Sequence, residues 1–380
     1  MKLTRAGTIE THIGVFNARA LRKVDLLMLV FFLGLAAIGI ATLFSANRSV
    51  SADTPYYLRQ LTFVPLGLAL ALWVACLDYR FLVSLAPVVY TALMGLLVAV
   101  LLWGTMVKGA QRWLNVGPIT LQPSEQSKLA LIFMLAWYLG KCGERIRTLP
   151  FFLLTFAIAA VPVALILKQP NLGTAASLGP ITVAMLYAAG CKRWHLGALV
   201  LLAAAALPVA WASMEDYQRQ RVLTFMDPMA DPKGAGYHTI QSMITVGSGG
   251  LTGKGYMQGT QTYLSYLPEH HTDFIFSLLA EEWGFMGAAA VVALYGAFLL
   301  RGLSFAQRSA DLEGVLLVVG VVAVLAFHII VNIAITLGLL PVTGIPLPFL
   351  SYGRSFYLTT ALSVGVLLSV HVQSKMRRES

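Results

Sequence analysis

The sequence has little charge. Asp, Glu, Lys and Arg together make up 12% of its 380 residues, about half the share found in soluble globular domains. Hydrophobic residues account for 58% of the chain, which excludes a soluble globular protein and indicates a membrane protein. Cysteine is also scarce: Cys76, Cys142 and Cys191 have neither the spacing of a metal site nor the even number of a disulfide framework.

Acidic residues are fewer than basic ones, 17 against 27, which gives a formal net charge of +10. An excess of this size can indicate nucleic-acid binding. Here, however, no patch interleaves basic and aromatic residues, and the basic residues fall mostly in short segments between apolar runs. Positive charge in such segments marks the cytoplasmic side of a membrane protein. We therefore exclude nucleic acid as a partner and expect both termini in the cytoplasm.

The apolar runs are continuous and about 20 residues long, which suits helices that cross a bilayer. The alternating segments of a membrane β-barrel are missing. We predict an all-α polytopic membrane protein, a single integral membrane domain of residues 1–380 with about ten transmembrane helices. The expected spans are 24–45, 60–77, 81–103, 125–140, 149–167, 172–190, 195–213, 272–300, 313–339 and 355–372.

Residues 1–23 form a polar segment that we expect in the cytoplasm, followed by an apolar run too long for a cleavable signal peptide. Residues 373–380 are expected to form a cytoplasmic tail. On the other side, one long extracytoplasmic loop, 214–271, joins the seventh and eighth helices. A loop of this length is usually functional or disordered. Its many glycines and tyrosines argue against disorder, so we predict that it folds over the outer surface as a lid.

Asp273 follows this loop and stands just inside the eighth apolar run. A carboxylate at membrane depth is energetically costly, so its default interpretation is functional. Four cations on the same side, Arg219, Arg221, Lys254 and Arg354, could bind an anion, because Arg suits bidentate contact with phosphate. Arg219 and Arg221 could equally be interfacial anchors.

Glu125 and Lys128 are three residues apart near the start of the fourth span, so they share one helix face and can form an ion pair. One interpretation is a structural lock. The other is a polar wall of a substrate cavity.

Several motifs occur in order along most of the chain. They include Arg112-Trp113-Leu114, Gln122-Pro-Ser-Glu-x-x-Lys128, Tyr217-Gln-Arg-Gln-Arg-Val222, Gly247-Ser-Gly-Gly-Leu251, Leu267-Pro-Glu-x-His-Thr-Asp273-Phe-Ile-Phe276 and Ser351-Tyr-Gly353. On these motifs the chain resembles the SEDS family (shape, elongation, division and sporulation). The Tyr-Gln-Arg-Gln-Arg stretch favours the elongation branch of that family over the division branch.

The resemblance implies a peptidoglycan glycosyltransferase in the bacterial cytoplasmic (inner) membrane that polymerises lipid II at the outer face. It implies that Asp273 is the general base, and that Arg219, Arg221, Lys254 and Arg354 bind the pyrophosphate. The polar residues expected around the cavity are Glu125, Lys128, Asn171, Glu269, His271 and Ser351. No resident metal site is expected, although a divalent cation such as Mg²⁺ or Mn²⁺ could assist the leaving pyrophosphate.

The implied partners are lipid II, undecaprenyl-linked glycan, membrane lipid, a class B penicillin-binding protein (the transpeptidase) and other proteins of the elongation complex. The alternatives are a lipid II flippase or transporter and a non-catalytic scaffold. Three positions depart from the family pattern: Asn115 and Asn171 stand where Asp is usual, and Arg354 stands where Gly is usual.

Overall fold

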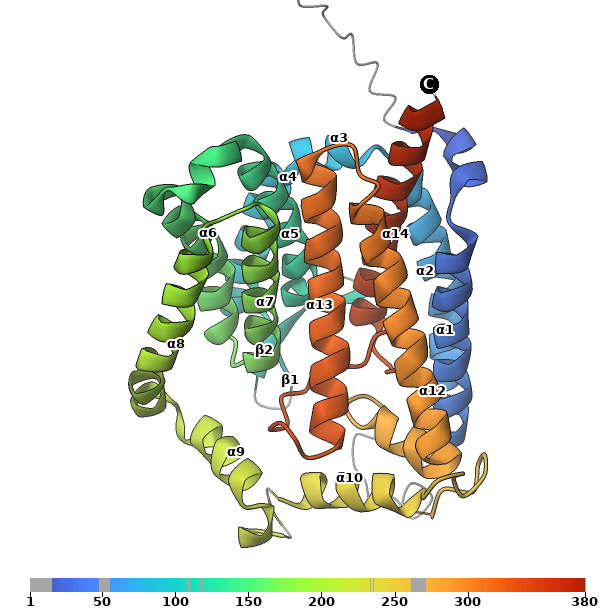
Figure 1. Cartoon of the computed structure of the whole chain (residues 1–380). Helices are drawn as coiled ribbons and strands as arrows, with labels where there is room; N and C mark the ends of the chain where they lie inside the picture. The colour runs from blue at the N-terminus through green and yellow to red at the C-terminus, as the bar shows by residue number, and fades with distance from the viewer. Residues whose placement is uncertain are drawn as a thin grey trace, which may run out of the picture.

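The computed structural model describes residues 16–47, 55–107, 110–116, 119–232, 234, 236–260 and 271–379. Long helices run side by side between two ends of the molecule (Figure 1). They are α1 (Leu26–Ala46), α2 (Tyr56–Ala75), α4 (Ala86–Trp103), α5 (Pro123–Cys142), α6 (Leu149–Leu167), α7 (Leu172–Ala188), α8 (Arg193–Ser213), α12 (Ile275–Ala306), α13 (Leu312–Thr336) and α14 (Arg354–Glu379). Each of the ten expected spans has its counterpart in this set.

Shorter elements join the long helices. They are η1 (Ala18–Lys23), α3 (Tyr79–Ser84), η3 (Gly143–Arg147), α9 (Asp216–Met226), η4 (Pro228–Ala230) and α10 (Tyr237–Ser248). Side-chain caps mark several helix starts, because the first N–H groups of a helix need acceptors. Asp25 accepts a hydrogen bond from the N–H of Met28 at 2.8 Å, and Asp311 accepts one from Gly314 at 2.9 Å.

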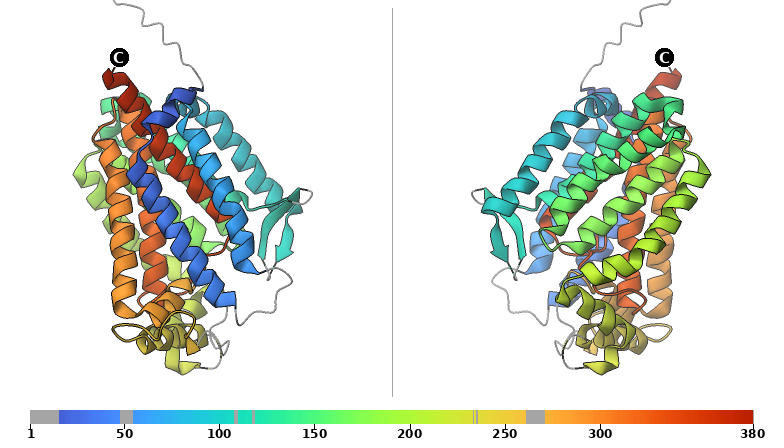
Figure 2. Two further views of the ribbon diagram at one scale, coloured as in Figure 1. Left: turned by 90° about the vertical axis from the view of Figure 1, so that its right-hand side faces the viewer. Right: turned by 90° about the vertical axis from the view of Figure 1, so that its left-hand side faces the viewer.

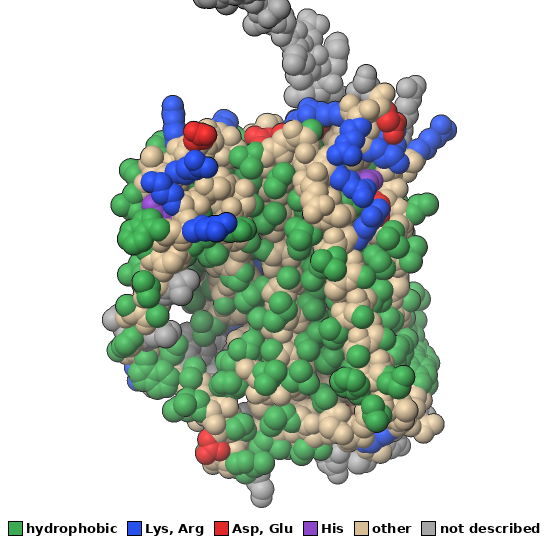
Figure 3. Space-filling view, in the orientation of Figure 1, with side chains coloured by type: hydrophobic (Ala, Val, Ile, Leu, Met, Phe, Trp, Pro, Cys, Tyr) green, Lys and Arg blue, Asp and Glu red, His purple; other side chains and the backbone are tan. Residues whose placement is uncertain are grey.

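Seven helices of the described chain are long and apolar enough to cross a membrane: α1, α2, α4, α6, α12, α13 and α14. The apolar α7 is shorter, at 17 residues. In Figure 3 hydrophobic side chains cover the middle of the molecule, while Lys and Arg gather towards the end at which α14 finishes. The chain is therefore a polytopic all-α membrane protein, as predicted, and a total of ten spans stays a prediction.

Helices α13 and α14 form the centre of the bundle. In the most apolar 18-residue stretch of α14, 89% of the residues are buried, whereas in that of α4 only 17% are. α14 packs along α2, and α13 packs against α5, α7 and α12. Ser and Thr hydroxyls inside α14 donate to carbonyls one turn back, as Thr359 does to Ser355 at 2.9 Å, so these buried groups are satisfied within the helix.

A small sheet was not predicted. Strands β1 (Thr105–Val107), β2 (Ala110–Val116) and β3 (Ile119–Leu121) form an antiparallel sheet in that order, with Leu114 opposite Leu121. It stands beside the end of α4 at the margin of the bundle (Figure 2). Its role in positioning the site is to carry Arg112 and Trp113 on β2.

The predicted span 272–300 is not one straight helix. Gly284 has φ +68° and ψ −168°, which divides α12 into a short inner piece and a long spanning piece. The segment 249–255 bonds to the break: the N–H of Lys254 donates to the carbonyl of Glu281 at 3.0 Å, and that of Phe285 donates to Gly250 at 2.9 Å. Backbones this close leave no room for side chains.

Both described ends of the chain lie at one end of the bundle, where Lys23 and Glu379 form an ion pair at 2.6 Å. The expected tail 373–380 continues α14 as helix through Glu379. The loop 214–271 reaches the opposite end (Figure 1) and contains α9 and α10. α10 packs on α12 and α13, and its Ser242 hydroxyl donates to the carbonyl of Thr336 at 2.8 Å.

Candidate active site

A cavity of about 710 Å³ lies inside the bundle, on the side of α10 rather than of the termini (Figure 1). It lies among β2, the start of α5, the start of α7, and the segments that precede α12 and α14. The residues that line it are Thr105, Arg112, Trp113, Gln122, Glu125, Asn171, Thr174, His271, Thr272, Asp273, Gly344, Pro346, Tyr352, Gly353, Arg354, Ser355 and Phe356. It brings together five predicted site residues from four separate parts of the sequence.

Asp273 is half-buried in this cavity, two residues before α12 begins. Its backbone is held from α13, because the Asn332 side chain donates to the carbonyl of Asp273 at 3.0 Å and to that of Ile345 at 2.7 Å. The preceding residues are held as well. The Ser351 hydroxyl donates to the carbonyl of Thr272. The backbone that carries the Asp273 side chain is therefore held by residues distant in sequence.

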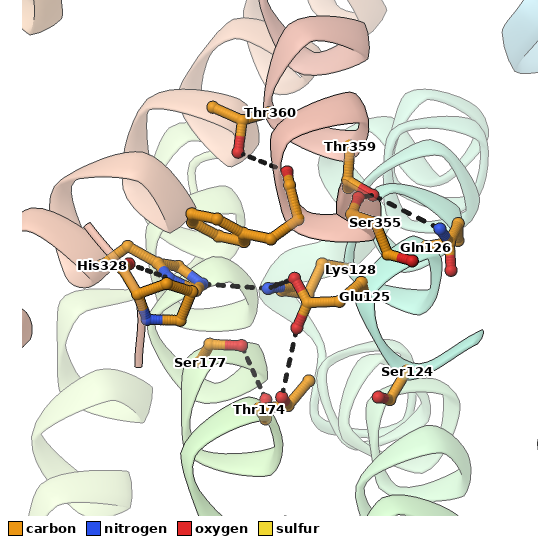
Figure 4. Close-up of polar contacts among 12 residues, drawn as sticks. Ser124, Glu125, Gln126, Lys128, Thr174, Ser177, His328, Ser355, Thr359 and Thr360 are labelled. Carbon is orange, nitrogen blue, oxygen red and sulfur yellow. Dashed lines mark hydrogen bonds and ion pairs between the residues drawn. The ribbon is translucent and has the colours of Figure 1, made fainter. Parts of the chain in front are cut away.

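The predicted ion pair forms next to the cavity, which Glu125 lines and Lys128 does not. Lys128 Nζ lies 2.8 Å from Glu125 Oε2, and both side chains are buried. A third partner comes from α13, since Lys128 Nζ lies 3.0 Å from His328 Nε2 (Figure 4). Thr174 of α7 donates to the other Glu125 oxygen at 3.4 Å. The pair thus joins α5, α7 and α13 beside the site.

Two further polar side chains complete the rim. Asn171 caps α7 by accepting a hydrogen bond from the N–H of Thr174 at 3.4 Å, and its amide donates to Ser124 at 3.4 Å. The asparagine therefore acts here through hydrogen bonds. Arg112 donates to the carbonyls of Gln169 and Pro170, which places a positive charge on the wall next to Asn171.

Arg354 also faces a second, adjoining hollow of about 540 Å³ on the α2 side, together with Leu58, Arg59, Thr62 and Phe63. Arg354 thus lines both hollows, and Arg59 lines only the second one. Sequence reasoning did not select Arg59, since it lies just before the expected second span and outside any motif used above. Only the packing of α2 against α14 brings it beside Arg354.

The other predicted cations lie elsewhere. Lys254 forms an ion pair with the buried Glu281 at 2.7 Å, and Arg219 donates to the carbonyls of Trp211 and Ala212. Neither lines the cavity. In this structure both side chains contact other residues of the protein. Their contact with pyrophosphate stays a prediction. The Arg221 side chain and Glu269 lie outside the described residues.

His271 lines the cavity and stacks on Tyr56, with ring centroids 4.2 Å apart. Among the described residues of the loop 214–271, it alone reaches the lining. The lid function of that loop stays a prediction.

The sequence contained a signal that we did not use. Glu281 and Glu282 are adjacent carboxylates inside the eighth apolar run, and both are buried. Glu282 accepts a hydrogen bond from Ser45 of α1. Two carboxylates at membrane depth, followed closely by a glycine, indicate a helix that is interrupted and packed inside the protein. Asn332, another polar residue inside a predicted span, was detectable in the same way.

The described residues do not form a resident metal site. No group of three or more His, Cys, Asp or Glu side chains among them is placed to hold an ion. The two carboxylates of the cavity are Asp273 and Glu125, and Glu125 is already paired with Lys128. Arg112 and Arg354 line the same cavity as these two carboxylates.

Comparisons with known proteins identify the family of the chain. A family model described as "Cell cycle protein", covering FtsW, RodA and SpoVE, matches residues 22–376. Peptidoglycan glycosyltransferase MrdB of Escherichia coli (strain K12) is 38% identical over 359 residues, which cover 94% of this chain and 95% of MrdB.

Two solved structures are similar over nearly the whole chain. A chain of a peptidoglycan synthase complex, described for its coordination of polymerization and crosslinking, has a TM-score of 0.80 and 32% identity, covering 92% of this chain and 98% of that one. The rod shape determining protein RodA of Thermus thermophilus has a TM-score of 0.68 and 30% identity, covering 92% and 96%. The chain belongs to the FtsW/RodA/SpoVE family, the SEDS family that its motifs resemble.

Proposed function

We propose that this protein is a peptidoglycan glycosyltransferase that joins lipid II units into glycan strands during cell elongation. The observation that carries the proposal is the position of Asp273. Its carboxylate lines a cavity of about 710 Å³ that Arg112 and Arg354 also line. A relative that is 38% identical over most of both chains is named a peptidoglycan glycosyltransferase.

Asp273 acts as the general base in this proposal. The acceptor is the 4-hydroxyl of a GlcNAc, and an alcohol is a poor nucleophile at neutral pH until a positioned base takes its proton. The oxygen then attacks C1 of the donor MurNAc while the bond from C1 to undecaprenyl pyrophosphate breaks. A single displacement inverts the configuration at C1 and needs no covalent enzyme intermediate.

The leaving group needs positive charge rather than an acid. Pyrophosphate departs as an anion, so cations fixed where the charge develops lower the barrier. Arg354 lines both hollows, and Arg59 lines the second one with it. Arg112, on β2, lines the cavity that holds Asp273. We assign the pyrophosphate to the Arg354 and Arg59 side of the site.

The proposed orientation puts the cavity on the extracytoplasmic side of the bacterial inner membrane and both termini in the cytoplasm. Its support is the gathering of Lys and Arg at the end that carries the C-terminus (Figure 3), since cytoplasmic segments are enriched in positive charge. We also propose a class B penicillin-binding protein as partner, because one similar structure is a complex that couples polymerization with crosslinking.

The direct test is polymerisation by the purified full-length chain. Incubated with lipid II in detergent, with and without the transpeptidase, the protein should produce glycan strands. Transport is impossible in detergent, so product formation excludes a flippase that does not catalyse transfer. A chain that produced no glycan with its partner present, yet moved lipid II across reconstituted vesicles, would reverse the assignment.

A further inference from the structure

A third hollow, of about 510 Å³, lies at the end of the molecule that carries the termini, away from the candidate active site. It is formed where α1 starts and where α12 and α14 finish. The residues that line it are Val24, Asp25, Leu26, Leu27, Arg301, Arg308, His371, Ser374, Lys375 and Arg378. The polymerisation reaction described above uses none of them.

Positive charge predominates in this hollow. Arg301, Arg308, Lys375 and Arg378 stand against a single lining carboxylate, Asp25. That carboxylate is already engaged, since it caps α1 and accepts a hydrogen bond from Arg301 Nε at 3.1 Å. Arg308, Lys375 and Arg378 are exposed. The hollow therefore offers several cations to an anionic ligand.

The surface next to the hollow is apolar. Leu26 and Val30 of α1 are 75% and 62% exposed, and Leu300 of α12 is 69% exposed. Leu26 and Val30 lie in the first turns of α1, which borders the hollow, and Leu300 directly precedes the lining residue Arg301 on α12. A small soluble anion would engage only the cations. A molecule with a phosphate and acyl chains would satisfy both surfaces at once.

We propose that this hollow binds the headgroup phosphate of an anionic phospholipid, with the acyl chains lying along α1 and α12. Basic hollows between membrane helices at the cytoplasmic side suit such headgroups. Arginine is well matched to phosphate oxygens because its N–H donors form paired hydrogen bonds. Because the ligand contacts α1, α12 and α14 together, its binding stabilises their packing. The proposal does not depend on catalytic activity.

The test measures lipid retention by the full-length protein in detergent. Short-chain phosphatidylglycerol and phosphatidylcholine are titrated separately, and bound lipid is counted by native mass spectrometry. The wild type should retain phosphatidylglycerol preferentially. Replacing two exposed cations, Arg308→Gln with Lys375→Gln, should weaken that retention about tenfold or more.

A matched control removes the same charge elsewhere at this end. Arg145 and Arg147 are exposed in η3, and the pair Arg145→Gln with Arg147→Gln should retain phosphatidylglycerol as the wild type does. The charge-preserving pair Arg308→Lys with Lys375→Arg should also retain it, which separates loss of charge from misfolding.

Three results would overturn the proposal. Equal retention of phosphatidylcholine would remove the requirement for an anionic headgroup. Equal loss in the Arg145 and Arg147 control would show that only diffuse charge matters. Displacement of the lipid by inorganic phosphate at the same concentration would show that the hollow is a site for small anions and not for lipid.

Discussion

At the scale of single residues, the position of Asp273 depends on contacts that its own sequence neighbourhood does not reveal. Asn332 and Ser351 bind the backbone around it from α13 and from the segment before α14. Sequence reasoning selected Asp273 because a carboxylate at membrane depth is costly. It could not supply the donors, because their proximity arises only from the packing of three distant segments.

Arg354 provides a test of the proposed leaving-group site. Arg354→Gln keeps a polar side chain but removes the charge, so kcat/KM for lipid II should fall about tenfold, as expected when one charge-assisted hydrogen bond to the departing phosphate is lost. Arg354→Lys should give a value between those of the wild type and Arg354→Gln. Steady-state polymerisation measures both variants.

Arg193→Gln serves as the control, because Arg193 is exposed at the start of α8 and does not line the cavity. It should leave kcat/KM unchanged. A wild-type kcat/KM for Arg354→Gln would show that this arginine does not stabilise the leaving pyrophosphate.

At the scale of elements, α12 shows where pattern reasoning reached its limit. Its hydropathy predicted one span, whereas Gly284 interrupts the helix and the segment 249–255 packs against the break. Hydropathy reports apolar character and is insensitive to a single residue with unusual dihedral angles. The adjacent buried carboxylates Glu281 and Glu282 carried the missing information.

Gly284→Ala should destabilise the protein strongly. Its φ of +68° with ψ of −168° is a conformation available essentially to glycine alone, and an added Cβ would lie 2.2 Å from the backbone nitrogen of Gly253. We expect a loss of at least about 1–3 kcal/mol from the backbone strain alone, seen as a lower Tm in detergent.

Gly247→Ala is the matched control. Gly247 lies within α10, and an added Cβ there meets no atom within 4 Å. Alanine in an unhindered helical position is neutral or stabilising. Equal Tm values for both variants would contradict the close approach at the α12 break.

The buried ion pair gives a second prediction at this scale. Lys128→Met leaves Glu125 without its cation and should cost about 3–5 kcal/mol, whereas Glu125→Gln with Lys128→Met should recover part of the loss. Thermal unfolding of Lys128→Met, Glu125→Gln and the double variant measures the coupling energy between the two side chains. If the losses of the two single variants simply add in the double variant, the two side chains are not coupled.

At the scale of the whole molecule, composition and hydropathy predicted the class of fold well. Ten apolar runs became ten long helices, because lipid leaves the backbone few alternatives to helix. The small sheet β1–β3 was missed, since its strands have three to seven residues and lie in a segment rich in glycine and polar residues. The cavity itself could not be predicted, because it exists only between elements.

The proposed orientation predicts the accessibility of single cysteines. Thr252 and Gln307 are exposed at opposite ends of the spanning part of α12, and the three native cysteines are buried. In intact spheroplasts, an impermeant maleimide should label Thr252→Cys. It should label Gln307→Cys only after permeabilisation. The reverse pattern would invert the topology and with it the side of the active site.

The central claim is that Asp273 takes the proton from the acceptor hydroxyl. The most direct measurement compares lipid II polymerisation by purified wild type, Asp273→Asn and Asp78→Asn. Asp78 caps α3 at the opposite end, and asparagine is an equally good cap, so that control should stay active. Asp273→Asn should keep its Tm and its lipid II binding but form glycan at least about 100-fold more slowly. Polymerisation by Asp273→Asn at the wild-type rate would contradict the account.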